Sequence, residues 1–253
     1  MTRPKSERRP SWPRLVLFDC DGVLVDSERL IASAEAEALA AAGFEASPRD
    51  LLDRFTGIPA ADMFRTIVTE QGRPLPAGFG AAVDRRIADA YRRRLEPIPD
   101  AEETLRRLDV PCCVASSSSL DRLRLALFVT GLDWLLMGRI FSTEMVARGK
   151  PAPDLFLHAA DRMGAAPAHC LVVEDSVAGV TAARAAGMTA FGFTGGSHGT
   201  PDLGEGLLAA GADLVFSRMA ALPQLIHGAE LDRTSRLAAG PGRGSPASTG
   251  GRA

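Results

Sequence analysis

The sequence predicts an α/β protein in which a parallel sheet is flanked by helices and interrupted once by a helical insertion. Short apolar segments typical of buried strands alternate with segments of helical periodicity, as in successive βα units. Residues 27–96 break this alternation and carry helical patterns only. A chain of 253 residues, 46% of them hydrophobic, is long enough to bury one α/β core and support an insertion.

Five short apolar segments are the predicted strands, and each is followed by polar or glycine-rich residues and then a helical pattern. They are residues 15–18, 112–115, 170–173, 190–193 and 214–216. Two of the helices between them carry signals at their ends. Asp100 is the expected N-cap of one, with Glu103 at capping-box spacing, and Gly187 is the expected glycine just beyond the end of another.

The insertion, residues 27–96, contains four predicted helices, at 27–43, 47–55, 60–72 and 81–95. Ser47 is the expected N-cap of the second, and Pro48 occupies its first helical position, where a missing N–H costs nothing. The proline-containing EPIPD segment closes the insertion. We expect a small helical cap over a core formed by residues 14–26 and 97–226.

The two ends of the chain have the composition of disordered segments. Residues 1–13 are rich in arginine and proline, and residues 227–253 end in a Gly/Ser/Pro-rich sequence. We expect an N-terminal arm over 1–13, a disordered tail over 227–253, and no part of the chemistry in either.

Charge and hydropathy exclude several classes of protein. A net charge of −2 and a pI near 6.1 provide no field for nucleic acid or an anionic membrane, and no apolar stretch has the length of a membrane span. No Cys-x-x-Cys pair is present, and three of the four cysteines lie in strand-like segments, so we expect neither a disulfide nor a zinc site. We expect a cytoplasmic protein, a monomer or weak homodimer.

Acidic residues follow two of the predicted strands. Asp19 and Asp21 follow the first, and Glu174 and Asp175 follow the third. Ligands of open α/β sheets bind beyond the carboxyl ends of the strands, so these side chains should converge. Converging carboxylates repel each other unless a cation or proton lies among them, and oxygen ligands without histidine or thiolate favour Mg²⁺. The sequence therefore predicts a magnesium site.

A hydroxyl and a cation follow other strands and suit a phosphate group. Ser116 directly follows the second predicted strand, with Ser117 beside it, and Lys150 lies in the RGKPAPD loop. Four serines in a row leave open which of them would bind phosphate. The 29 basic residues include only two lysines, Lys5 and Lys150, so a chain that otherwise uses arginine has kept the compact ammonium group at position 150.

The Asp-x-Asp-Gly spacing places two carboxyl groups on one side of an extended segment. Asp19 is suited to attack phosphorus and form an aspartyl-phosphate, and Asp21 to protonate the leaving oxygen and then to activate water. Gly22 permits the unusual turn that the chain needs at that point.

Four ordered motifs of this chain resemble those of the haloacid dehalogenase-like hydrolases. They are FDCDGVLVDSE, VASSSS, GKPAPDLF and LVVEDSVAGVTAARAAGM. The similarity spans about residues 15–225 and is strongest to capped phosphatases and β-phosphoglucomutases, including bacterial 6-phosphogluconate phosphatase-like members.

The resemblance implies a Rossmann-like, three-layer core with an inserted four-helix cap. It further implies Mg²⁺ held by Asp19, the backbone carbonyl of Asp21 and Asp175, with Glu174 assisting, and a phosphoryl group held by Ser116 and Lys150. The expected activity is hydrolysis of a small phosphorylated metabolite, a sugar phosphate above all.

Three other functions are weighed against this one. A β-phosphoglucomutase would use the same core residues, but members of that type carry a histidine early in the first cap helix, where this chain has none. A dehalogenase of the same fold would lack Asp21. A phosphate-accepting receiver domain would order its motifs differently and have no cap.

Other polar residues have a structural interpretation that competes with a functional one. His158 and His169 are expected to be structural, whereas His198 follows a strand and is a candidate neighbour of the site. Arg54 and Arg65 of the insertion are candidates for contact with an anionic substrate, although surface ion pairs are the commoner fate of such residues.

Overall fold

The computed structural model describes residues 12–55 and 58–239, which contain a six-stranded parallel sheet. Its strands are β1 (Leu15–Phe18), β2 (Cys112–Ser116), β3 (Ile140–Ser142), β4 (Cys170–Glu174), β5 (Thr189–Phe193) and β6 (Leu214–Phe216). Their order is β3-β2-β1-β4-β5-β6. The five predicted strands are confirmed to within one residue at each end. Strand β3 was not predicted: only two of its three residues, Ile140 and Phe141, are apolar, whereas the equally short β6 is apolar throughout.

The central strand β1 determines which strand ends meet. Phe18, its last residue, pairs with Val114 of β2 on one side and Val173 of β4 on the other. All three strands are parallel, so the residues that follow them leave the sheet along the same edge. The backbone N–H of Asp19 extends this pairing by donating to the carbonyl of Val173 at 3.0 Å.

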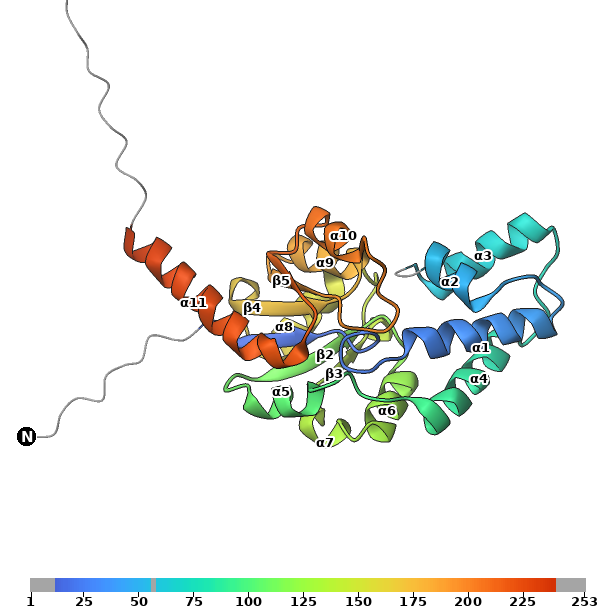
Figure 1. The fold of residues 1–253 in the computed structure, drawn as a ribbon, viewed down its shortest axis with the longest axis horizontal. Helices are drawn as coiled ribbons and strands as arrows, with labels where there is room; N and C mark the ends of the chain where they lie inside the picture. The colour runs from blue at the N-terminus through green and yellow to red at the C-terminus, as the bar shows by residue number, and fades with distance from the viewer. Residues whose placement is uncertain (1–11, 56–57, 240–253) are drawn as a thin grey trace, which may run out of the picture.

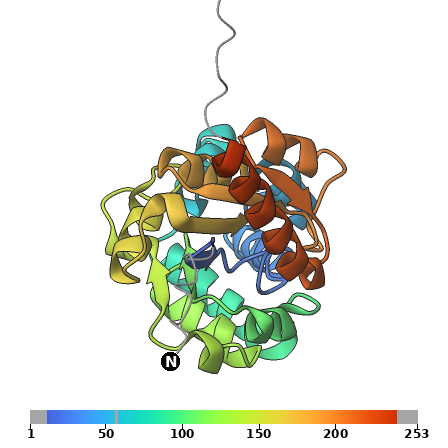
Figure 2. The ribbon, with the colours of Figure 1, turned by 90° about the vertical axis from the view of Figure 1, so that its left-hand side faces the viewer.

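Alternate residues of β1 face two different helical layers. Leu15 and Leu17 belong to the cluster of α8 (Asp154–Arg162), α9 (Val177–Ala185) and α10 (Leu203–Ala209). Val16 and Phe18 belong to the cluster of α5 (Ala101–Arg107), α6 (Leu120–Val129) and α11 (Leu222–Ala239). All four side chains are buried, and burial of a Leu or Phe side chain stabilises a fold by roughly 1.5–3 kcal/mol. Figure 2 shows helices on both faces of the sheet. The predicted three-layer core is confirmed.

Four helices form the insertion between β1 and α5. They are α1 (Glu28–Ala41), α2 (Pro48–Phe55), α3 (Ala60–Gln71) and α4 (Phe79–Arg94). They lie together beyond one end of the sheet, opposite α11 (Figure 1). Ser47 and Asp50 exchange side-chain-to-backbone hydrogen bonds around the start of α2, as expected of its N-cap. The predicted four-helix cap is confirmed.

Short elements complete the chain: α7 (Asp133–Leu136) and three single turns of 3₁₀ helix, η1 (Thr143–Met145), η2 (Pro167–His169) and η3 (Met219–Ala221). Gly187 has φ +72° directly beyond the C-cap of α9, as predicted. Asp100 does precede α5, but its side chain makes no capping hydrogen bond and its φ is +65°. The expected capping box is therefore wrong, because the left-handed backbone at Asp100 directs its side chain elsewhere.

Both chain ends are more ordered than expected within the described residues. The disordered tail predicted from residue 227 is wrong for residues 227–239, which continue α11. The predicted arm is wrong at Trp12, which is 7% exposed and packs in the main core cluster. Trp12 is itself buried, whereas α11 has its buried residues Leu222 and Ile226 before position 227 and continues from there as a helix. The rest of both predicted segments, 1–11 and 240–253, lies outside the described residues.

Two further features concern composition. Cys20, Cys112, Cys113 and Cys170 are all buried free thiols, as expected of small apolar side chains. Within residues 12–55 and 58–239, no helix combines the length and hydropathy needed to cross a bilayer.

Candidate active site

The chain turns sharply after β1, and glycine is essential to that turn. The N–H of Gly22 donates to the carbonyl of Val25 at 2.8 Å, and Gly22 has φ +75°. A Cβ atom at this position would lie 1.9 Å from Oδ2 of Asp175. Gly22 therefore serves two purposes: it adopts a backbone conformation that is strained for other residues, and it leaves room for the acid of the β4 loop.

Three buried carboxylates converge at the ends of β1 and β4. Asp19, Glu174 and Asp175 each offer an oxygen within 4.8 Å of the others. Burial, together with the charges of neighbouring carboxylates, raises the pKa of Asp19 above its ordinary value, even though Lys150 opposes this. Burial also raises the pKa of Asp175. An oxygen-rich, electrostatically unfavourable group of this kind fits a hard divalent cation.

Glu174 is held in place from two directions. One carboxylate oxygen pairs with the Lys150 ammonium, and the other accepts from the backbone N–H of Ser176 at 3.1 Å and its hydroxyl at 2.9 Å. A Cβ atom on Gly179 of α9 would fall 1.9 Å from this carboxylate. Because Gly179 in the helical SVAGV segment has no side chain, it leaves room for the Glu174 carboxylate.

Lys150 lies between the acids of two strands. Its ammonium nitrogen is 3.1 Å from Oδ1 of Asp19, pairs with Glu174, and lies 5.0 Å from the ring centroid of Phe156. The side chain is 3% exposed. Burial disfavours its charge, but Asp19 and Glu174 outweigh that effect and raise the pKa of Lys150. Lys150 is therefore a permanent cation beside Asp19.

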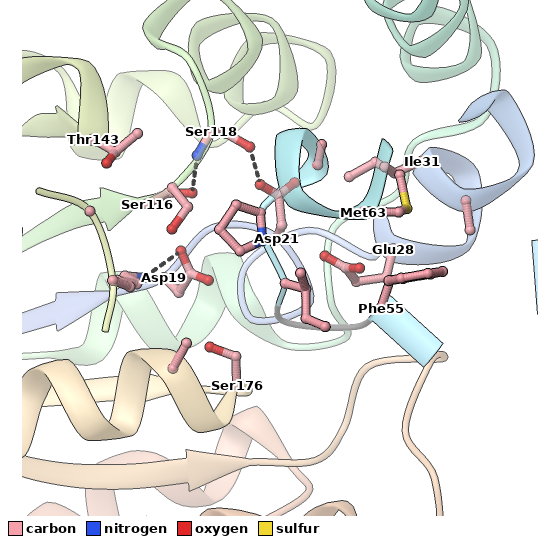
Figure 3. Close-up of a pocket in the computed structure, with 18 of the residues that line it drawn as sticks. Asp19, Asp21, Glu28, Ile31, Phe55, Met63, Ser116, Ser118, Thr143 and Ser176 are labelled. Atoms are coloured by element: carbon pink, nitrogen blue, oxygen red, sulfur yellow. Dashed lines mark hydrogen bonds and ion pairs between the residues drawn. The ribbon is translucent and has the colours of Figure 1, made fainter. Parts of the chain in front are cut away.

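Asp21 points away from this acidic group and is held by three hydroxyl groups. Ser27 donates to Oδ1 at 2.6 Å, and Tyr91 of α4 donates to the same oxygen at 3.1 Å. Ser118 donates to Oδ2 at 2.6 Å, as Figure 3 shows. Sequence reasoning missed these partners. Tyr91 is the only tyrosine of the chain and lies in the arginine-rich helical segment AYRRRL, which carries no motif that points to the site.

The four consecutive serines each have a different environment, so the run is not a low-complexity loop. Ser116 ends β2 and is 1% exposed, and its hydroxyl accepts from the N–H of Ser118 at 3.2 Å. Ser117 lines the cavity described below. The hydroxyl of Ser119 accepts from the N–H of Arg122 and caps α6. Ser116 and Ser117 remain the predicted phosphate ligands, while Ser118 holds Asp21.

His198 lies deeper in the site than expected. Its Nε2 is 3.2 Å from Oδ2 of Asp175, and its side chain is 2% exposed. The hydrogen bond and charge of Asp175 raise the pKa of His198, although burial opposes this. His158 packs edge-on against Phe141, and the carbonyl of His169 accepts from the N–H of Arg14, so both have structural contacts.

A cavity of about 530 Å³ lies between the core and the cap. Its core wall carries Asp19, Asp21, Lys150 and Asp175 together with the serines of the β2 loop. Its cap wall is largely apolar and includes Ile31, Phe55 and Met63, which face the core acids in Figure 3. The space has the size of a small-molecule site.

Three ionisable residues lie between the two walls: Glu28, Glu35 and Arg122. None was predicted. Burial, with the nearby charges of Asp175 and Asp21, raises the pKa of Glu28 to about 8. The predicted cap arginines lie elsewhere: Arg54 pairs with Glu70 at 2.5 Å and Arg65 with Asp62 at 2.9 Å, and neither lines the cavity.

Comparison with known proteins decides the family. The family model of the haloacid dehalogenase-like hydrolases matches residues 13–187. This chain belongs to that family. The resemblance to this family is thereby confirmed. The protein is a hydrolase, as expected.

Relatives of the hydrolase cover most of its length. It is 30% identical over 187 residues to 6-phosphogluconate phosphatase of Escherichia coli strain K12, covering 74% of this chain and 85% of the relative. A haloacid dehalogenase-like protein of Agrobacterium tumefaciens shares 39% identity and a TM-score of 0.76, covering 85% and 98% of the two chains. A family hydrolase of Deinococcus radiodurans, solved with phosphate and sodium, shares 36% identity and a TM-score of 0.71, covering 86% and 96%.

Proposed function

We propose that this hydrolase is a magnesium-dependent phosphatase that cleaves a small phosphorylated metabolite, a sugar phosphate, through an aspartyl-phosphate on Asp19. The observation that carries the proposal is the placement of Asp19 at the base of the cavity, between a buried ammonium group and two further carboxylates. The phosphate in the related Deinococcus structure and the activity of the E. coli relative support the same chemistry.

In the first step, a carboxylate oxygen of Asp19 forms a bond to phosphorus while the bond from phosphorus to the leaving oxygen breaks. Asp21, in its protonated form, gives its proton to that oxygen. Ser27, Tyr91 and Ser118 are hydroxyl groups that can donate or accept, so the same contacts suit either protonation state of Asp21. In the second step, Asp21 takes a proton from a water molecule whose oxygen attacks phosphorus. The bond from phosphorus to the Asp19 oxygen breaks, which releases phosphate and restores the Asp19 carboxylate.

The phosphoryl group would be held by Ser116, Ser117 and Lys150. Lys150 offers a compact positive charge for oxygens on which charge accumulates, and it is already oriented by Asp19 and Glu174. The expected ligands of Mg²⁺ are Asp19, Asp175 and the Asp21 backbone carbonyl, with Glu174 assisting; the bound ion would neutralise the phosphate and the acids. His198 would orient Asp175.

Removal of divalent metal should stop turnover, and Mg²⁺ should restore it. EDTA-treated protein is expected to release no phosphate from 4-nitrophenyl phosphate until Mg²⁺ is added. A second measurement does not depend on activity: Mg²⁺ should raise the Tm, because an ion that binds only the folded state stabilises it. Asp175→Asn should lose most of that rise. Full activity in EDTA would contradict the metal assignment.

The product distinguishes the phosphatase from a phosphomutase that would use the same core residues. With β-glucose 1-phosphate, we expect free phosphate and glucose to accumulate, measured by a phosphate assay and by chromatography. Helix α1 has no histidine, and it lines the cavity with Glu28, Ile31, Ala32 and Glu35. Accumulation of glucose 6-phosphate without free phosphate would replace the phosphatase proposal with the mutase.

A further inference from the structure

Glu35 of the cap is a buried acid that has no hydrogen-bonded or ion-paired partner among the described residues, although the charge of Arg122 acts on it from a greater distance. It is 6% exposed, it lines the cavity, and within the described part of the chain its carboxylate makes no hydrogen bond or ion pair. A carboxylate loses considerable free energy when it leaves water without gaining partners. Such a side chain in a cavity wall is suited to a ligand that supplies the missing donors.

The surroundings of Glu35 define which donors these are. Glu28 lies two helical turns earlier on α1 and lines the same cavity, so two acids of one helix face it. Among the described lining residues, the cations are Lys150 and Arg122. Lys150 forms ion pairs with Asp19 and Glu174, and Arg122 donates to Asp84 of α4 at 2.9 Å. The region beyond the phosphate site therefore has more acidic groups than unpaired cations, and it is negative once Glu35 is ionised, above a pH of about 7.

Arg122 offers hydrogen-bond donors near Glu35 but does not neutralise its charge by an ion pair, because Arg122 pairs with Asp84. Its guanidinium group has five N–H donors, and one nitrogen is used by Asp84. Arg122 is the third residue of α6 and lies in the first turn of the helix, which Ser119 caps. Glu35 and Arg122 together present an acceptor and donors, which is the pattern that hydroxyl groups satisfy, because each hydroxyl both donates and accepts.

We propose that Glu35, with Arg122, selects the leaving group: a neutral polyhydroxylated chain that donates a hydroxyl to Glu35, rather than one carrying a second anionic group. The proposal rests on the proposed phosphatase function and specifies its substrate. A carboxylate or second phosphate on the leaving group would meet Glu35 and Glu28 without an unpaired cation to receive it. The apolar side chains of the cap wall, such as Phe55 and Met63, would cover the carbon skeleton.

The test compares two esters that differ at one carbon. Glucitol 6-phosphate and 6-phosphogluconate share the same chain, and the first has a hydroxyl where the second has a carboxylate. At pH 8, wild-type protein with Mg²⁺ should show a kcat/KM at least about tenfold higher for glucitol 6-phosphate, because two like charges in a partly desolvated site repel strongly. Glu35→Gln should reduce this ratio about tenfold, mainly by improving 6-phosphogluconate.

Glu37→Gln is the matched control. Glu37 lies on the same helix and is exposed, so its neutralisation changes the net charge equally and should leave the ratio unchanged. A ratio in Glu35→Gln equal to that of wild type would overturn the proposal, as would a wild-type preference for 6-phosphogluconate.

A binding measurement separates this inference from the function on which it rests. Asp19→Asn is expected to bind substrate without turnover. Calorimetry on this variant should give a lower Kd for glucitol 6-phosphate than for 6-phosphogluconate, and the double variant Asp19→Asn, Glu35→Gln should bind the two esters equally. Equal Kd values in both backgrounds would overturn the inference even in an active phosphatase. Lack of wild-type turnover of 4-nitrophenyl phosphate would overturn the function, while the Kd values would still decide the role of Glu35.

The ionisation of Glu35 can also be followed through the pH dependence of the protein's stability. Burial raises the pKa of Glu35 from 4.5 to about 7, with Arg122 opposing the shift. The folded state therefore holds this proton more tightly than the unfolded state, and the stability it contributes is lost as pH rises from about 4.5 to about 7. Glu35→Gln should gain Tm relative to wild type between pH 5 and pH 8. A constant difference would contradict a buried, unpartnered Glu35.

Discussion

Asp19→Asn should abolish phosphate release. The amide lacks the negative oxygen that attacks phosphorus, and it cannot form the acyl-phosphate bond on which the second step depends. We expect kcat to fall by at least a factor on the order of a thousand, which corresponds to about 4 kcal/mol of activation free energy. The measurement is release of phosphate from 4-nitrophenyl phosphate and from a sugar phosphate, each with Mg²⁺ present.

The fold should survive this change. Asn has nearly the size of Asp, and burial with neighbouring acids raises the pKa of Asp19, so neutralisation removes repulsion from the site. The Tm of Asp19→Asn should therefore equal or exceed that of wild type near neutral pH. Asp53→Asn in the exposed face of α2 makes the same exchange away from the cavity and should retain full activity. Activity of Asp19→Asn within about tenfold of wild type, about 1.4 kcal/mol, would contradict the nucleophile assignment.

Lys150→Arg should lower kcat/KM by about a hundredfold or more, as loss of a well-placed charged donor does in other phosphoryl and acyl transfer sites. Lys150 is enclosed by Asp19, Glu174 and the ring of Phe156. A planar guanidinium group is larger than an ammonium group, so it cannot keep both ion pairs in the same space, and overpacking costs about 1–3 kcal/mol.

A second variant and a control distinguish lost charge from lost packing. Lys150→Met keeps much of the side-chain volume but leaves Asp19 and Glu174 facing each other, so it should lower activity at least as much as Lys150→Arg. Arg148→Lys makes the reverse exchange two residues away, at a side chain that is 70% exposed and paired with Asp154, and should be nearly silent. Wild-type kinetics for Lys150→Arg would refute the need for a compact ammonium group.

Local sequence was sufficient for the elements and for the acids of the core. Strand β1 is four consecutive buried apolar residues, and parallel strands bring the residues that follow them to one edge, so Asp19, Glu174 and Asp175 could be expected together. Helix α2 begins where Ser47 and Pro48 predict it. These predictions depend on periodicity and on caps, which involve residues close in the chain.

Where tertiary contacts overrode composition, the predictions failed. Residues 227–239 have a polar sequence typical of disorder, yet they belong to α11. This helix packs through Leu222 and Ile226 in the same core cluster as α5. The helix thus begins in the core and extends beyond it. Strand β3 exists because β2 offers it a neighbouring edge, with Val114 opposite Ile140, and not because of its own three residues.

By itself, the sequence determined the fold class, the insertion of the cap and the acidic group with its lysine. The first two follow from hydrophobic periodicity, and the third follows from short motifs near the ends of strands. Only the tertiary structure decided which cap residues reach the site: Tyr91 donates to Asp21, and Glu35 lines the same cavity as Arg122 of the core. The physical reason is that the partners are far apart in the sequence: Tyr91 and Asp21 are separated by 70 positions, and Glu35 and Arg122 belong to the cap and to the core. No local periodicity encodes how two separately formed surfaces meet.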